Sequence, residues 1–178
     1  PCGGPGGKIM RAKIPLILVM ISIVMLLLVS CSTGKEELVP GRYAGFKPGD
    51  YMDLSSNTSI GGSIMDLSLD GETLLLEKRF ARGMEEFIIY IAKFTKSSQT
   101  TSFWYNLIRE VSNDFRSVVS ALPLIYGEFQ GEVRQGYMRA WFSGKWLYVF
   151  LGKTKSEVNS MVKAFKEFEK LLVKSIDS

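Results

Sequence analysis

The sequence is divided by an apolar run from Ile14 to Val29, which contains one serine and no charged residue. Arg11 and Lys13 precede the run. Sixteen such residues behind two cations are typical of the hydrophobic region of a secretory signal peptide. Only the residues after this run are therefore expected to build a folded domain.

The run ends in the four residues Leu28-Val29-Ser30-Cys31. This tetrad resembles the lipobox of bacterial lipoproteins. In that family the cysteine sulfur carries a diacylglyceryl group, and cleavage makes the cysteine the new N-terminus. The resemblance implies a signal peptide over residues 10–30 and a lipid anchor on Cys31. The residues after Cys31 resemble no family that we recognise.

An uncleaved transmembrane anchor is the alternative interpretation of the apolar run. Residues 14–30 would span about 25 Å as a helix, which is short of the hydrocarbon core of about 30 Å. The lipobox therefore favours lipidation. Both interpretations predict an extracytoplasmic domain at a membrane, because Arg11 and Lys13 hold the N-terminus in the cytoplasm.

The rest of the chain divides by composition. Residues 1–9 are rich in Gly and Pro and are interpreted as a non-native or upstream extension. Residues 31–50 combine several Gly and Pro residues with little apolar periodicity, which predicts a tether. Residues 51–178 are long enough for one domain with a core of its own.

The charge and the cysteine count exclude several classes of partner. The net charge is +4, but Lys8, Arg11 and Lys13 precede Cys31 and no acidic residue does, so the remainder carries only +1. Nucleic acid is therefore not expected as a partner. The chain has no histidine and only Cys2 and Cys31, so the usual ligands of zinc, haem and copper are lacking and no cofactor is expected.

Periodicity after residue 50 predicts strands, a helix, more strands and a second helix. The polar stretch 53–62 is interpreted as a loop or weak edge strand, and Asp70-Gly71 as a hairpin turn. Strands are expected over residues 64–69, 74–80, 87–94, 125–133, 137–142 and 146–151. Helices are expected over 102–121 and 155–176, the second one capped by Thr154 with Glu157.

This order predicts an α+β fold, in which an antiparallel sheet carries both amphipathic helices on one face. The strand ends before the two helices are similar, Phe-Thr-Lys-Ser at 94–97 and Lys-Thr-Lys-Ser at 153–156. The similarity suggests two β-β-β-α halves related by a pseudo-twofold. Coincidence within a short stretch is the alternative.

One segment has the spacing of a calcium loop. Asp66, Ser68 and Asp70 stand at positions 1, 3 and 5, Gly71 at position 6 and Glu77 at position 12. No helix is predicted before the segment, as an EF-hand requires. A plain Asp-Gly hairpin is therefore preferred, and no metal site is expected.

The second hairpin supplies the candidate binding surface. A two-residue turn at Ser143-Gly144 would pair Trp141 with Trp146 and place six side chains on one face. They are Tyr137, Arg139, Trp141, Trp146, Tyr148 and Phe150. If the helices cover only the other face, this aromatic face is exposed and fits a protein, peptide or sugar. The alternative is that the N-terminal segment or the core covers it.

These patterns predict a membrane-tethered lipoprotein with a non-enzymatic binding or assembly role and a protein partner in the cell envelope. One alternative is a carrier of apolar solutes or lipids, with a cavity between sheet and helices. Another is an envelope hydrolase that uses two carboxylates, for which the sequence indicates no catalytic residues.

Overall fold

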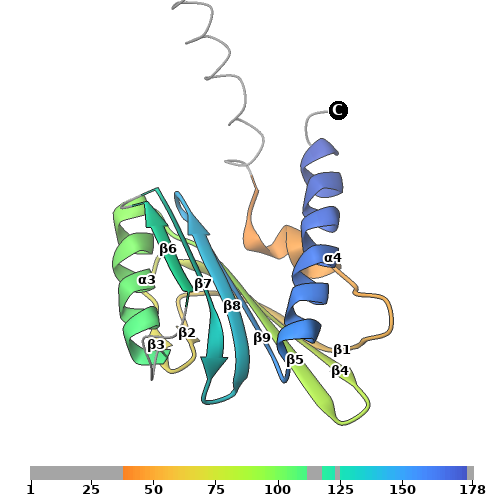
Figure 1. Ribbon diagram of the computed structural model, residues 1–178. Coiled ribbons are helices and arrows are strands. Elements are labelled where there is room, and N and C mark those ends of the chain that lie inside the picture. Colours follow the sequence, from red (N-terminus) through yellow and green to blue (C-terminus); the bar gives the residue numbers. More distant parts are fainter. Residues whose placement is uncertain (1–37, 112–117, 123–124, 176–178) are drawn as a thin grey trace, which may run out of the picture. The chain divides into compact units, whose positions relative to one another are not determined.

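The computed structural model describes residues 38–111, 118–122 and 125–175, and its centre is a seven-stranded antiparallel sheet (Figure 1). The strand order is β1 (Met52–Ile60), β4 (Leu74–Arg82), β5 (Glu85–Lys93), β9 (Trp146–Gly152), β8 (Gly136–Ser143), β7 (Tyr126–Val133) and β6 (Val118–Leu122). The short strands β2 (Ser63–Ile64) and β3 (Leu67–Ser68) pair separately. The helices are the 3₁₀-helix η1 (Pro40–Gly45), α3 (Ser97–Val111) and α4 (Lys155–Lys174).

The predicted α+β class with an antiparallel sheet is confirmed, but the placement of both helices on one face is wrong. Alternate residues of β9 enter different cores. Leu147 and Val149 pack with α3, whereas Tyr148 and Phe150 pack with α4. Figure 1 shows the two helices on opposite sides of the sheet. The strand β9 is buried along its whole length, because both of its faces are covered.

The two predicted halves are recognisable in the strands and not in the helices. The orders β1-β4-β5 and β7-β8-β9 run inwards to the central β5/β9 pair. A twofold axis that relates antiparallel neighbours is perpendicular to the sheet, so it would leave both helices on the same face. Because α3 and α4 lie on opposite faces, no such axis relates the complete halves.

Two-residue turns connect the β4–β5 and β8–β9 hairpins. Gly83 and Gly144 occupy the first turn position with φ of 63° and 57°, the backbone that a type II′ turn requires there. The second turn is Gly144-Lys145, with Ser143 opposite Trp146, so the predicted turn at Ser143-Gly144 is wrong by one position.

The predicted Asp70-Gly71 hairpin is also wrong. The strand β4 pairs with β1, and the β2–β3 hairpin lies within the connection between them. Met65 and Asp66 form the tight turn of this small hairpin, with φ of 49° and 70°. The side chain of Asp70 instead accepts hydrogen bonds from Thr73 Oγ1 and from the backbone N–H of Glu72.

Helix α3 differs more from its predicted range than helix α4 does. Helix α3 begins before Ser102 and ends at Val111, and residues 118–122 form β6 instead of a last helical turn. Residues 112–117, which include Phe115, lie outside the described residues. In α4, Thr154 caps the helix by accepting from the N–H of Glu157, as predicted. The Glu157 carboxylate accepts from Lys153 N, one residue before the usual capping-box position.

The predicted tether over residues 31–50 is too long, because the domain begins at Leu38. Leu38, Tyr43 and Phe46 are buried on the face of the sheet that α4 covers. Two lysines from the sheet hold the segment in place. Lys93 Nζ donates to Leu38 O at 2.6 Å, and Lys78 Nζ donates to Ala44 O at 2.6 Å and to Phe46 O at 3.0 Å.

Candidate functional site

The aromatic hairpin face is formed as predicted and is buried. Tyr137, Trp141, Trp146, Tyr148 and Phe150 belong to one core cluster and are each at most 8% exposed. The one-position error in the turn moves each partner by two residues, so Trp141 is opposite Tyr148 and the face is preserved.

Helix α4 and the segment before β1 cover this aromatic face. The ring of Phe165 in α4 lies 5.1 Å from Phe150 and 5.3 Å from Tyr43, measured between centroids. The ring of Tyr43 lies 5.8 Å from that of Trp146. The prediction of an exposed binding surface at Tyr137–Phe150 is therefore wrong, and the alternative that the N-terminal segment and the core cover it describes the structure.

Arg139, the sixth residue of that face, is half-buried and donates three hydrogen bonds within the protein. Its guanidinium donates two hydrogen bonds to Glu128 Oε1, at 2.8 and 3.0 Å, and one to Asn159 Oδ1 at 3.1 Å. Tyr126 OH donates to Glu128 Oε2 at 2.7 Å. Burial, together with the Glu128 carboxylate, raises the pKa of Tyr126 to about 12. The cluster ties α4 to β7 and β8, and its donors are committed to protein partners.

The carboxyl group of Glu128 is held in its charged form. Burial by itself raises the pKa of Glu128, but the hydrogen bonds from Tyr126 and Arg139 and the charges of Arg139 and Lys166 outweigh it and lower the pKa overall. A general acid needs the opposite shift. This arrangement stabilises the fold and does not suit acid catalysis.

Replacing Glu128 by glutamine is expected to remove stability in a pH-dependent manner. A carboxyl whose folded pKa is lowered contributes stability above its unfolded pKa of about 4.3, and the contribution is lost as the pH falls through the lower folded pKa. At pH 7 the loss should be about 1 kcal/mol, because the pair is partly exposed. Urea unfolding of both proteins between pH 7 and pH 3 checks this, and a constant difference across that range would contradict it.

A second polar cluster lies in the core. Tyr43 OH and Tyr148 OH each donate to Glu169 Oε1 at 3.0 Å. Burial raises the pKa of both phenols, and the charge of Glu169 raises it further. The protonated phenols therefore act as fixed donors that join the N-terminal segment and β9 to α4.

The residues of the calcium-loop pattern do not form a common site. The Asp70 carboxylate is used within its own turn, and Glu77 Oε1 accepts from Arg79 Nε at 2.6 Å. Over residues 38–111, 118–122 and 125–175, no group of three or more His, Cys, Asp or Glu side chains is placed to hold a metal ion.

Another surface is offered by the edge strand β1, which the sequence indicated only as a loop or weak edge strand. It pairs with β4 on one side, and within the described part of the chain no strand pairs with its other side. Eight of its nine residues are exposed. Leu54 and Ile60 are 51% and 70% exposed.

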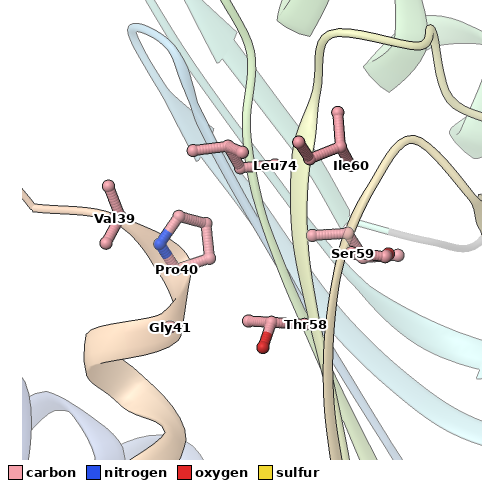
Figure 2. A pocket seen from close by; sticks show the side chains of 8 residues that line it. Val39, Pro40, Gly41, Thr58, Ser59, Ile60 and Leu74 are labelled. Atoms are coloured by element: carbon pink, nitrogen blue, oxygen red, sulfur yellow. The ribbon is translucent and has the colours of Figure 1, made fainter.

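An apolar groove of about 460 Å³ lies beside the end of β1. Figure 2 shows Val39 and Pro40 on one wall, and Ile60 and Leu74 across from them. The remaining lining residues are Gly41, Thr58, Ser59 and Leu75. The groove exists because the N-terminal segment packs across the sheet next to its edge, and it contains no charged side chain.

An open strand edge beside an apolar groove is the arrangement that β-strand addition uses. The unpaired backbone N–H and C=O groups of the edge supply hydrogen bonds to an extended segment. A pocket next to the edge accepts one of its side chains. The sequence signal for this site is a neutral Ser/Thr/Asn-rich stretch that contains no Lys and no Pro.

Comparison with known proteins adds no family and no function. No protein family matches the sequence, and no curated protein matches it. Among solved structures, the crystal structure of a GTP binding regulator from Thermotoga maritima is similar to 70% of this chain and 86% of that chain. The identity is 22% and the TM-score is 0.49, so the similarity carries no conclusion about what this chain does.

Proposed function

We propose that this chain is a membrane-tethered, extracytoplasmic lipoprotein with a non-enzymatic assembly role in the cell envelope. Its lipid would be attached to Cys31, and its partner would be an extended polypeptide segment that adds to β1. The lipobox supports the first part. The observation that carries the second part is the exposed, neutral edge of β1 beside an apolar groove.

The length of the connection fits a domain held close to a membrane. Seven residue steps separate Cys31 from Leu38, so the connection can reach at most about 25 Å. A domain confined in this way has a raised effective concentration toward neighbours on the same membrane. No helix in the described ranges is long and apolar enough to span a bilayer.

The two alternative functions find less support. An apolar carrier needs a cavity between sheet and helix, but Phe165 fills the space beneath α4 with ring contacts to Tyr148 and Phe150. Neither α3 nor α4 lines the groove. A carboxylate hydrolase needs an acid with a raised pKa. The shifts found for Glu128 and Glu167 are both downward.

The lipid is tested by replacing Cys31 with serine in the full-length chain expressed in a bacterium. The wild-type protein should incorporate labelled palmitate and have the mass of a chain that begins at an acylated Cys31. The Cys31→Ser variant should lose the label completely, because a hydroxyl is not a substrate for the thioether linkage.

The same substitution at the other cysteine is the matched control. Cys2→Ser should retain full palmitate labelling, since residue 2 precedes the expected cleavage site. A wild-type protein without acyl mass, or equal labelling of Cys31→Ser, would overturn the lipoprotein assignment.

A further inference from the structure

We propose that the segment added to β1 is β1 of a second copy, so that the sheet continues across a symmetric dimer. This inference rests on the strand-binding role proposed above and specifies its partner. It follows from three properties of the described domain: an edge that is neutral from Leu54 to Ile60, a self-complementary register and the position of the N-terminal segment.

The edge of β1 carries few of the features that keep strand edges apart. Natural edges are protected by lysine, proline, bulges, inward charges or covering loops. In β1 the pairing with β4 is interrupted by a register shift between Asp53 and Ser55, at one end of the strand. From Leu54 to Ile60 the strand contains no charge and no proline. The one charged residue of the strand, Asp53, is paired with the buried Lys78 at 2.8 Å. Residues 54–60 of a second copy would therefore meet no like charge along this part of the edge.

An antiparallel pair centred on Asn57 makes the strand complementary to itself. Asn57 then lies opposite Asn57 of the other copy, and Leu54, at the register shift between Asp53 and Ser55, comes opposite Ile60 at the end of the pair. By symmetry the Leu54–Ile60 pair occurs twice, once at each end. Between them Ser55 faces Ser59 and Ser56 faces Thr58, which are hydroxyl pairs suited to cross-strand hydrogen bonds.

The groove lies beside one of the two exposed aliphatic residues of the edge. Ile60 forms part of the groove together with Val39 and Leu74. In the proposed register, Leu54 of the second copy lies across from Ile60 and therefore beside this groove. Its burial there removes from water two exposed aliphatic side chains per end. This is the kind of contact that gives an isologous interface its stability.

The symmetry also suits two copies on one membrane. The twofold axis of an antiparallel strand pair is perpendicular to the sheet, so the faces covered by α4 point the same way in both copies. Leu38, where the connection from Cys31 enters the domain, packs in the core on that face. In both copies Leu38, the first described residue after Cys31, therefore lies on the same side of the sheet, as two lipid anchors in one bilayer require.

A cysteine at the centre of the proposed register gives a direct test. Asn57→Cys would bring two Cα atoms to about 4.5–5.5 Å, which lies within disulfide range. The full chain expressed in cells should then form a disulfide-linked dimer in the envelope. Met84→Cys is the control, because Met84 is fully exposed at the β4–β5 turn. It should give only background crosslinking.

Charge at the same position gives the second test. Asn57→Lys would place two like charges opposite each other at the twofold axis. The dissociation constant of the dimer should therefore rise at least about tenfold. The fold should persist, because Asn57 is opposite Glu77 of β4 and the lysine gains a cross-strand partner there. The measurement is the mass of the full-length protein in detergent, with Met84→Lys as the exposed control.

The outcomes separate this inference from the lipoprotein proposal. A palmitate-labelled protein that is monomeric, and whose Asn57→Cys variant does not crosslink above the Met84→Cys background, overturns the dimer and leaves the lipid anchor standing. A crosslinked dimer without acyl mass overturns the lipid anchor alone. An Asn57→Lys variant as dimeric as the wild type also overturns the β1 interface.

Discussion

Replacing Phe165 by alanine is expected to lower the free energy of unfolding by about 4 kcal/mol. Phe165 is fully buried in α4. Its ring lies between 5.1 and 5.8 Å from the rings of Tyr43, Phe46, Tyr148 and Phe150. These neighbours come from the N-terminal segment and β9, so three elements would have to move together to close the cavity.

Chemical unfolding monitored by circular dichroism measures this loss. Leu171→Ala is the matched control, because Leu171 lies in the same helix and is 69% exposed. It should change the free energy of unfolding by less than about 0.5 kcal/mol. Equal losses in the two variants would contradict the assignment of Phe165 to the centre of the core.

Replacing Lys78 by methionine is expected to cost about 3 kcal/mol, although methionine has nearly the same length and is more apolar. Lys78 is 1% exposed. Its ammonium binds the Asp53 carboxylate and the carbonyl oxygens of Ala44 and Phe46. Methionine would leave the Phe46 carbonyl buried without this donor and the Asp53 carboxylate without its counter-ion.

The Lys78→Met change has a local signature that distinguishes it from general destabilisation. It should release the N-terminal segment first and make the chain more sensitive to trypsin at Arg42. The control is Lys153→Met, because the side chain of Lys153 is 71% exposed and its ion pair with Glu85 is 3.5 Å long. That variant should remain within about 0.5 kcal/mol of the wild type. Unchanged proteolysis at Arg42 in Lys78→Met would contradict the anchoring role.

The sequence predicted which residues share a face of the sheet better than it predicted which elements pack on that face. Alternation placed Tyr137, Trp141 and Tyr148 on one face, and the structure confirms this grouping because a turn shift by one position preserves the pleat. It left open whether the aromatic face would be exposed or covered. Periodicity within β8 and β9 identifies two apolar faces without saying which helix packs on which.

The prediction of a tether over residues 31–50 failed because it was based on local composition. Contacts with residues far away in sequence determine whether this segment is ordered. The Gly- and Pro-rich stretch around Pro40 has no periodicity of its own. It becomes ordered through Lys93 and through the burial of Tyr43 and Phe46 against α4. These partners lie far away in sequence, so no local pattern indicates them.

The candidate site was missed for a related reason. A polar Ser/Thr/Asn stretch such as 53–62 is equally typical of a loop and of a solvent-exposed edge strand. Only its pairing with β4 decides between them. The groove depends in addition on the packing of Val39 and Pro40 beside that edge, which no spacing within β1 can encode.

The contact between Tyr43 and Glu169 has a consequence for the timing of folding. The two residues are 126 positions apart, and their hydrogen bond closes the core near both ends of the domain. During synthesis the aromatic core therefore stays incomplete until the last helix has left the ribosome. Folds with such non-local closure form slowly. If the chain is exported as proposed, slow folding would leave it unfolded for longer. An unfolded chain can pass through a translocon, whereas the folded domain cannot.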